Sequence, residues 1–361
     1  MKKPQILMMA AGTGGHVFPA LAVAEELTQH GAVIHWLGTA AGMENGLVEP
    51  TGYAFHTIAM QGLRGKGVAR LLKMPSALLS ATMATVKIIR SNKIEMVVGF
   101  GGYVTAPGGI AAKMTGTPLI IHEQNAIAGM SNRYLAKIAL KVLQAFENTF
   151  GDSQKSAKLA TVGNPVRNTI TGVAAPATRY DVSDNSPLRL LVVGGSLGAQ
   201  VLNENLPKAL ALIDKPFVVN HQCGRHNEQA TQKAYDDEEL SQHDISVQPF
   251  ISDMAAAYHW ADIVVCRAGA LTVTEIQNVG IAAILVPLPH AVDDHQTANA
   301  RTLTEHGAGV LLPQTELTPE RLSKELSALD RSSCLAMAKK GHALANRHAS
   351  QQVADIIWQA L

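Results

Sequence analysis

Two halves of the chain open on the same local pattern, in which a short apolar run leads through glycines into a stretch of helical periodicity. Residues 6–10 are apolar and continue into Gly12-Thr13-Gly14-Gly15-His16. Residues 188–193 are again apolar and continue into Gly194-Gly195-Ser196-Leu197-Gly198. A strand, a glycine turn and a helix in this order begin a parallel α/β unit, so the repeat predicts two such units in one chain.

The other apolar runs favour the same α/β fold class. They alternate with helical stretches at residues 96–100, 118–121, 142–146, 217–219, 263–266, 283–286 and 309–312. Such alternation predicts doubly wound parallel sheets. A chain of 361 residues is longer than a single domain with one hydrophobic core usually is. We expect two Rossmann-like domains that face a cleft, residues 1–163 and 164–361, with the boundary near Gly163-Asn164-Pro165. The last helix, about residues 347–361, is a candidate to pack back on the N-terminal domain.

Composition narrows the setting in which the protein works. The three cysteines, Cys223, Cys266 and Cys334, are far apart, which predicts no disulfide framework and favours a reducing cytoplasm. No uncharged apolar run reaches about 20 residues, so we expect no membrane-spanning helix. Residues 1–7 run directly into a strand-like stretch and carry no small-residue cleavage site, so we expect no signal peptide. Residues 1–163 carry 15 Lys and Arg against 8 Asp and Glu, whereas residues 164–361 carry 15 against 21. The basic half can steer anionic partners, unless the asymmetry is chance.

Each glycine turn is a candidate anion site, because it exposes backbone N–H groups and directs the positive end of a helix dipole at a ligand. The dinucleotide fingerprint is absent, since its third glycine would fall at Val17, and no acidic residue ends the run at 34–39. No G-K-[S/T] phosphate loop occurs. The pattern therefore disfavours NAD and P-loop nucleotides, and a tight turn without a ligand is the alternative.

Polar side chains follow two predicted strands of the first half. Gly101-Gly102-Tyr103 follows one strand and His122-Glu123-Gln124-Asn125 follows the next. We expect His16, Glu123 and Asn125 to converge at one edge of the sheet, where a histidine near a carboxylate can act as a general base. Each of them could instead be a turn or capping residue.

The second half carries a further helix start with a carboxylate. Arg267-Ala268-Gly269 leads into a helical stretch in which Glu275 lies about one turn from the start. This carboxylate can accept hydrogen bonds from a sugar diol, or it is an ordinary first-turn acid that the helix dipole favours. No Asp-x-Asp occurs in the chain, so the common carboxylate route to a metal-bound nucleotide diphosphate is missing. We expect no metal and no other cofactor.

Together these motifs resemble those of the MurG family, the bacterial peptidoglycan glycosyltransferases that add N-acetylglucosamine to lipid I and share the two-domain GT-B fold. The matching segments span nearly the whole chain in the family's order: residues 12–19, 62–67, 101–104, 122–125, 163–167, 194–196, 270–275 and 294–297.

The resemblance implies a role for each matching residue. The residues implied in binding the donor UDP-N-acetylglucosamine are Thr13, Gly14, Gly15, Asn125, Arg167, Ser196, Ile251, Ala270, Leu271, Thr272, Val273, Thr274, Glu275 and Gln296. Among them, Glu275 matches the carboxylate at the ribose and Ser196 the hydroxyl at the diphosphate. His16, Tyr103 and Glu123 match the acceptor-side residues of catalysis, with His16 the expected base and Glu123 the second candidate.

The implied reaction is an inverting displacement that converts lipid I into lipid II. The C4 hydroxyl of N-acetylmuramic acid in undecaprenyl-pyrophosphoryl-MurNAc-pentapeptide attacks the anomeric carbon of the donor, and UDP leaves. Two alternatives stay open. One is another GT-B enzyme, such as a natural-product glycosyltransferase or a UDP-sugar epimerase, and the other is a non-catalytic UDP-sugar-binding scaffold. Residues 62–67 and 122–125 favour the lipid I enzyme.

A lipid acceptor also implies peripheral attachment to the cytoplasmic face of the inner membrane. The residues expected on the membrane side are Arg64, Lys66, Arg70, Lys73, Leu78, Leu79 and Met83. A basic rim beside apolar side chains suits docking on an anionic leaflet, and an ordinary core helix with a basic approach is the alternative. Proteins of cell-wall and division assemblies are possible partners, and nucleic acid is not expected.

Overall fold

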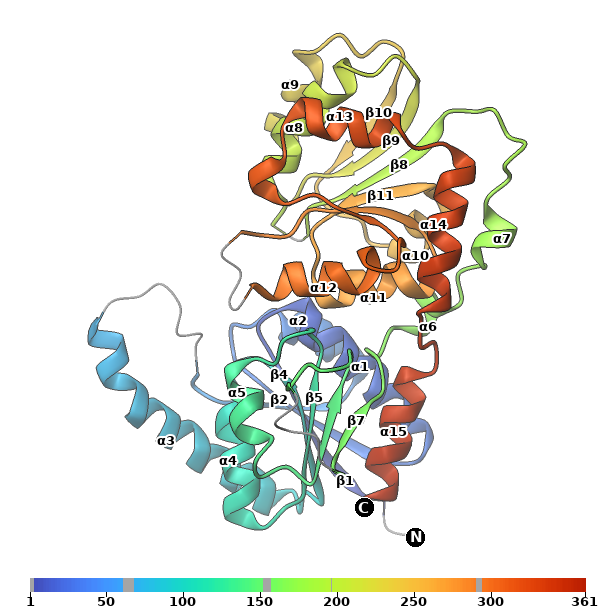
Figure 1. Cartoon of the computed structure of the whole chain (residues 1–361). Coiled ribbons are helices and arrows are strands. Elements are labelled where there is room, and N and C mark those ends of the chain that lie inside the picture. Colours follow the sequence, from blue (N-terminus) through green and yellow to red (C-terminus); the bar gives the residue numbers. More distant parts are fainter. Residues whose placement is uncertain (1–2, 61–67, 152–156, 196, 290–293) are drawn as a thin grey trace. The chain divides into compact units, whose positions relative to one another are not determined.

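The chain folds into two compact units in a computed structural model that describes residues 3–60, 68–151, 157–195, 197–289 and 294–361. Of residues 68–73 only the backbone is described. The first unit comprises Met1–Arg167 and Asn346–Leu361, and the second comprises Asn168–Ala345. The second unit therefore begins after Arg167, and the last segment of the chain belongs to the first unit (Figure 1).

The first unit is a parallel sheet with helices on both faces. Its elements are β1 (Gln5–Ala10), α1 (Gly14–Gln29), β2 (Val33–Gly38), α2 (Glu44–Val48), η1 (Glu49–Thr51), β3 (Ala54–Thr57), α3 (Val68–Ser91), β4 (Met96–Gly101), α4 (Thr105–Thr115), β5 (Leu119–Glu123), α5 (Met130–Leu135), β6 (Lys141–Gln144), β7 (Leu159–Thr161) and α15 (Ala349–Gln359). Within the described residues the strand order is β3-β2-β1-β4-β5-β6-β7, and every neighbouring pair is parallel.

Alternate side chains of the first sheet feed two cores, because successive residues of a strand point to opposite faces. Ile6 and Met8 of β1 pack with Val23 of α1 and Val353 of α15. Leu7 and Met9 face the other way, into the core that α3 and α4 cover. The central strands are apolar on both faces, as parallel strands covered by helices require.

The second unit repeats the design. Its elements are α6 (Asn168–Thr171), α7 (Pro176–Arg179), β8 (Leu188–Val193), α8 (Gln200–Ala211), β9 (Phe217–Gln222), α9 (Glu228–Asp236), β10 (Asp244–Gln248), α10 (Met254–Trp260), β11 (Ile263–Cys266), α11 (Ala270–Val279), β12 (Ala282–Leu285), α12 (His295–Thr304), β13 (Val310–Leu311), η4 (Gln314–Glu316), α13 (Pro319–Ser327) and α14 (Arg331–Ala343). The strand order in the described part is β10-β9-β8-β11-β12-β13, again with parallel neighbours. The prediction of two doubly wound parallel sheets is confirmed.

The strand orders also locate the binding edge of each sheet. In the first unit the order reverses between β1 and β4, and in the second between β8 and β11. Ligands of open α/β sheets bind at the carboxyl ends of the strands at such a switch point. The two predicted glycine turns follow β1 and β8, so each lies at the switch point of its own unit. Among the described helices, none is long and apolar enough to cross a membrane.

Candidate active site

The first glycine turn joins β1 to α1 and brings Tyr103 against it. Gly12 has φ +94°, a conformation that glycine adopts without strain, and a Cβ there would meet the Tyr103 ring at 3.0 Å. Thr13 is the N-cap residue of α1 in extended conformation, and Gly14 and Gly15 are the first helical residues. Their backbone N–H groups lie in the first turn of the helix, where an anion binds most favourably.

His16 lies on this first turn, beside the end of β4. Its Nδ1 is 3.3 Å from the carbonyl oxygen of Ala11 and 3.2 Å from the Thr13 hydroxyl. A carbonyl oxygen only accepts, so the Ala11 contact favours the tautomer with the proton on Nδ1 and the lone pair on Nε2. A Cβ on Gly101 would lie 2.7 Å from the ring, so the glycine at the end of β4 makes room for the imidazole.

A buried carboxylate that the sequence did not indicate accepts a hydrogen bond from the backbone of this turn. Glu44, on α2, is fully buried, and its oxygens accept hydrogen bonds from the backbone N–H of Gly12 (3.2 Å) and of Thr39 (2.9 Å). The Thr39 hydroxyl also donates to Glu44 (2.9 Å) and lies 3.4 Å from the Tyr103 hydroxyl. Glu44 thus links the glycine turn to the end of β2 and, through Thr39, to Tyr103.

Glu123 ends β5 and organises the loop that follows. One carboxylate oxygen accepts from the backbone and the side-chain N–H groups of Asn125, both at 3.0 Å. The other accepts from the Gly129 N–H (3.0 Å) and from the Asn132 side chain (2.8 Å). Removing a proton from a substrate would require this carboxylate to give up some of these bonds, so its geometry suits holding Asn125 in place.

His122 is fully buried and neutral at physiological pH. Burial lowers its pKa to about 4, against the opposing effects of a hydrogen bond to Gly163 and the charge of Glu123. Its Nε2 donates to the Gly163 carbonyl (2.9 Å), and its Nδ1 accepts from the Gln124 amide (3.2 Å). The ring stacks on Phe100, with centroids 5.3 Å apart. His122 therefore fixes the end of β5 next to Glu123.

The second glycine turn follows β8, and Gln222 of β9 holds it. The Gln222 side chain accepts from the Gly195 N–H (3.2 Å) and donates to the Gly195 carbonyl (2.9 Å). The same amide donates to the carbonyl of Pro249 (3.2 Å), which links the turn to the loop that carries Ile251. Ile251 is nearly buried. Ser196, the predicted diphosphate contact, lies outside the described residues.

The start of α11 holds the largest group of predicted donor residues. Gly269 is its N-cap residue and Ala270 to Glu275 form its first turns. Leu271 and Thr272 are half-buried, whereas Val273, Thr274 and Glu275 are buried. Burial, followed by the charge of Glu275, raises the pKa of the Cys266 thiol to about 12.

Two predicted donor residues have definite partners elsewhere. Gln296, on α12, accepts from the backbone N–H of Leu288 (2.9 Å). Arg167 belongs to the first unit, where its guanidinium lies over the Phe18 ring of α1 at 4.5 Å from the centroid. Within the described residues no group of three or more His, Cys, Asp or Glu side chains could hold a metal ion.

The predicted site residues thus fall into two sets, one in each unit. In the first unit, the glycine turn, His16 and Tyr103 lie together at the ends of β1 and β4, and Glu123 with Asn125 follows the neighbouring strand β5. In the second unit, the residues at the start of α11 follow β11, next to β8 and its glycine turn.

Comparisons with known proteins agree with this architecture. Residues 6–144 match the glycosyltransferase family 28 N-terminal domain, and residues 189–357 match the glycosyltransferase family 28 C-terminal domain. The chain is 79% identical, over all 361 residues and the whole relative, to the UDP-N-acetylglucosamine--N-acetylmuramyl-(pentapeptide) pyrophosphoryl-undecaprenol N-acetylglucosamine transferase of Psychrobacter arcticus.

Solved structures place the fold in the same group. The crystal structure of Acinetobacter baumannii MurG matches with a TM-score of 0.85 and 45% identity, covering 99% of each chain. CalG4, the calicheamicin glycosyltransferase, matches with a TM-score of 0.68 but only 15% identity, over 99% of this chain and 98% of that one, which shows the shared fold alone. The resemblance found in the sequence is confirmed: the chain belongs to glycosyltransferase family 28 and is a glycosyltransferase of the GT-B fold.

Proposed function

We propose that this enzyme transfers N-acetylglucosamine from UDP-N-acetylglucosamine to the C4 hydroxyl of N-acetylmuramic acid in lipid I, forming lipid II and UDP. The observation that carries the proposal is the 79% identity, over the full length of both chains, to a transferase whose name states that donor and that acceptor. The low identity to natural-product glycosyltransferases such as CalG4 argues against the first alternative. The name of the 79% identical relative states a transferase activity, which argues against a scaffold without catalysis.

We assign the donor to the second unit. The start of α11 directs backbone N–H groups and the positive end of a ten-residue helix toward the diphosphate, which stabilises the charge of leaving UDP without a metal. Glu275 binds the ribose hydroxyls, and Ile251 and Gln296 contact the uracil and the sugar. Ser196 completes the diphosphate contacts. We also assign Thr13, Gly14, Gly15, Asn125 and Arg167, all of the first unit, to donor binding.

We assign the acceptor to the first unit, with His16 as the base. In the tautomer that the Ala11 contact favours, Nε2 takes the proton of the C4 hydroxyl as its oxygen attacks the anomeric carbon and the bond to UDP breaks. Glu123 positions Asn125, and Tyr103 lines the acceptor side. The base and the contacts to the leaving group are thus assigned to different units.

The experiment that tests this function measures UDP release from UDP-N-acetylglucosamine, with and without a short-chain lipid I analogue and in the presence of EDTA. We expect release that depends on the acceptor and survives the chelator. Tight UDP binding without acceptor-dependent release would instead support the scaffold or a different acceptor. Release that EDTA abolishes would overturn the metal-independent mechanism.

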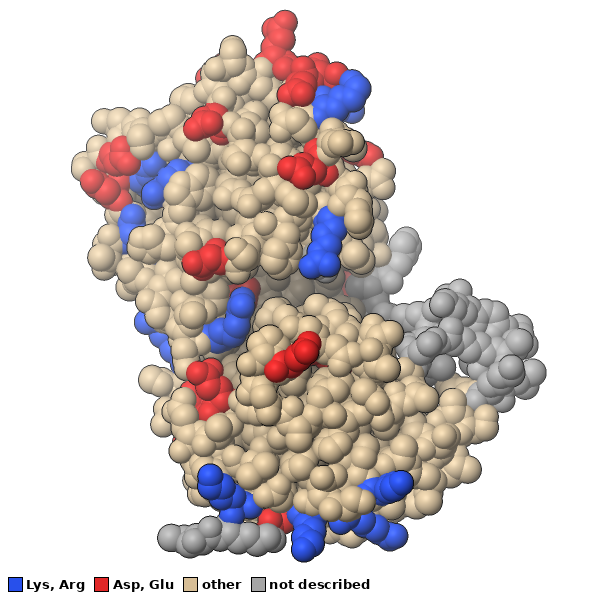
Figure 2. Space-filling model, turned by 180° about the vertical axis from the view of Figure 1, so that it is seen from behind, with Lys and Arg blue, Asp and Glu red and all other residues tan. Residues whose placement is uncertain are grey.

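We further propose that the first unit docks on the cytoplasmic face of the membrane through α3, α4 and α5. Helix α3 packs on α4, and α4 on α5. Their exposed apolar side chains include Leu79 (61% exposed), Met83 and Met114, with Met130 and Tyr134 on α5. Exposed basic residues on the same helices are Lys87, Arg90, Lys113 and Arg133. Figure 2 shows Lys and Arg gathered at the lower end of this unit.

The other residues predicted to dock are less exposed, or they or their side chains lie outside the described part of the chain. Leu78 is half-buried. Arg64 and Lys66 lie outside the described residues, and Arg70 and Lys73 lie on α3 with side chains that are not described. Of the residues predicted to dock, Leu79 and Met83 are those whose side chains are both described and exposed, so the test is made on them.

The double substitution Leu79→Glu with Met83→Glu is expected to weaken binding to anionic phospholipid vesicles by about tenfold or more, because each buried apolar side chain contributes roughly 1.5–3 kcal/mol. Vesicle co-sedimentation measures the loss. Leu212→Glu is the control, since Leu212 is a comparably exposed leucine of the second unit (55% exposed). Turnover with a soluble acceptor analogue should stay unchanged. Equal losses in the double variant and the control would refute docking through α3.

A further inference from the structure

A buried tyrosine contacts the proposed ribose carboxylate. The Tyr258 hydroxyl, on α10, donates a hydrogen bond to one carboxylate oxygen of Glu275 at 3.1 Å. Tyr258 is 1% exposed and Glu275 is 6% exposed. The two residues lie on different helices, so the contact joins α10 to α11. No sequence motif marks Tyr258.

The contact bears on the orientation of the Glu275 carboxylate. The terminal torsion of a glutamate is broad, so the plane of its carboxylate is set by whatever hydrogen bonds it accepts. In a buried setting an unmet carboxylate is costly, so the phenol both stabilises the charge and selects one orientation. A carboxylate whose plane is already fixed can accept hydrogen bonds from the two neighbouring hydroxyls of a ribose at a lower cost in conformational entropy.

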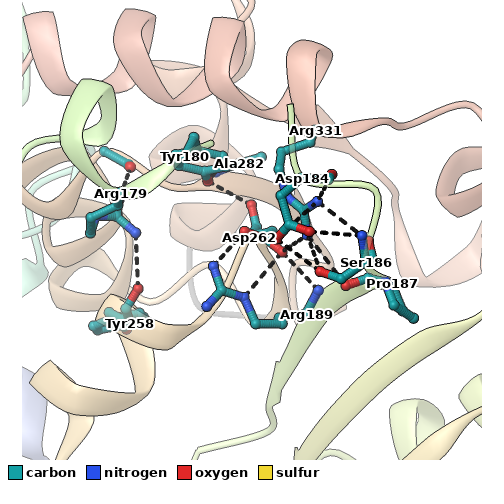
Figure 3. A network of polar contacts seen from close by, with 11 residues as sticks. Arg179, Tyr180, Asp184, Ser186, Pro187, Arg189, Tyr258, Asp262, Ala282 and Arg331 are labelled. Carbon is teal, nitrogen blue, oxygen red and sulfur yellow. Dashed lines mark hydrogen bonds and ion pairs between the residues drawn. The ribbon is translucent and has the colours of Figure 1, made fainter. Parts of the chain in front are cut away.

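The helices that carry the pair are themselves held together by one guanidinium. Arg179, at the end of α7, donates to the carbonyl of Tyr258 (3.2 Å) and to the carbonyls of Val279 (3.1 Å) and Gly280 at the end of α11. Figure 3 shows its guanidinium directed at the Tyr258 carbonyl. Arg179 therefore fixes the backbone of Tyr258 relative to the helix of Glu275.

We infer that Tyr258 is a positioning residue that orients the Glu275 carboxylate toward the vicinal diol of the donor's ribose. The inference rests on the proposed function, in which Glu275 binds that ribose. Tyr258 touches Glu275 and acts through it, so its removal should weaken recognition of the diol rather than the chemical step. The chemical class that this pair selects is a ribonucleoside diphosphate over its 2′-deoxy counterpart.

The test compares the affinities of the full-length protein for UDP and for 2′-deoxy-UDP by titration calorimetry. Tyr258→Phe, which removes only the hydroxyl, should reduce the preference for UDP by about three- to tenfold. This is the net effect of an ordinary hydrogen bond and less than that of one made directly to a charged group, because Tyr258 acts on the ribose only through Glu275. The KM for UDP-N-acetylglucosamine should rise by a similar factor while kcat changes little. A ratio of two affinities does not depend on the folded fraction, so a partly unfolded variant still gives a valid result.

Two further variants distinguish the positioning role of Tyr258 from the assignment of Glu275 to the ribose. Tyr235→Phe is the matched control, because Tyr235 is also buried in the second unit but its hydroxyl pairs with His221 at 2.8 Å. It should leave the preference unchanged. Glu275→Gln should reduce the preference at least as much as Tyr258→Phe, and the double variant should lose no more than Glu275→Gln alone.

Each outcome decides one of the two claims. If Glu275→Gln lowers the preference and Tyr258→Phe does not, the positioning role is wrong and the ribose assignment stands. If neither changes it, the ribose assignment of Glu275 is wrong. If Tyr235→Phe changes the preference as much as Tyr258→Phe, then loss of any buried tyrosine hydroxyl in the second unit has this effect, and the inference fails.

Discussion

His16→Ala is expected to lower kcat by about 10²–10⁴-fold, the usual contribution of a general base, while the affinity for UDP stays within about twofold. The reason is the division of labour proposed between the units. His16 lies on the first turn of α1 in the first unit, whereas the proposed nucleotide contacts lie mainly at the start of α11 in the second. Initial rates with a short-chain lipid I analogue, together with UDP titration, measure the two effects separately.

Imidazole rescue and two comparison variants identify the base. Added imidazole should restore part of the His16→Ala turnover, because it replaces the missing proton acceptor. His30→Ala, at the C-terminal end of the same helix, should leave kcat unchanged. If Glu123→Gln abolishes turnover and His16→Ala does not, Glu123 is the base. Loss of UDP affinity in His16→Ala equal to the loss of turnover would contradict the assignment of donor and acceptor to separate units.

Among the described strands, the sequence predicted the central ones and one edge strand, β13, but missed the other three edge strands. All seven apolar runs between residues 96 and 312 lie at strands of the two sheets. The strands that the analysis did not predict are β3, β7 and β10, each at an edge of its sheet. Edge strands are only half covered, and these three are partly exposed, so they lack the continuous apolar run that marks a buried parallel strand.

Parts of the candidate site were predictable for a different reason. A glycine turn after a strand, and a polar residue at a strand end, are local features that topology brings to one edge. Glu44 and Tyr258 were missed because their meaning depends on partners chosen by tertiary packing. Glu44 reaches Gly12 across 32 residues of sequence, and Tyr258 reaches Glu275 between two helices. Gly42 makes room for the Glu44 carboxylate, since a Cβ there would lie 2.1 Å from it, but that reason is visible only in the folded protein.

A second large effect, on the stability of the second unit, is expected at the amino end of β11, opposite the switch point. One aspartate there joins three segments of the chain. Asp262 is 1% exposed and immediately precedes β11. It accepts from the backbone N–H and the guanidinium of Arg189, at 2.9 Å each, and from Arg331 at 3.2 Å. Arg331 also donates to the carbonyls of Ser186 and Pro187, so the network ties the start of α14 to the segment before β8 (Figure 3).

Asp262→Ala is expected to lower the free energy of unfolding of the second unit by about 3–5 kcal/mol, because removing one partner of a buried ion pair leaves the other uncompensated. Arg331, 7% exposed, would lose its buried carboxylate partner and keep only the ion pair with the exposed Asp184, at 3.6 Å. Urea unfolding of the full chain measures the change. Asp237→Ala is the matched control, since Asp237 pairs with Lys233 on the surface, where such pairs contribute about 0.3–0.5 kcal/mol. Equal losses would show that burial of Asp262 adds nothing.

The same network makes a prediction about pH whose sign follows from the charge of the carboxylate. Burial alone would raise the pKa of Asp262, but the hydrogen bonds and charges of Arg189 and Arg331 outweigh it and hold the pKa below its ordinary value. A carboxyl whose pKa is lowered by folding stabilises the protein above its unfolded pKa of about 4, and that stability is lost as the pH falls through the folded value. The difference in stability between the natural protein and Asp262→Asn should therefore be full at pH 7 and shrink below about pH 4. A difference that grows as the pH falls would mean that folding raises the pKa of this carboxyl above its unfolded value instead of lowering it.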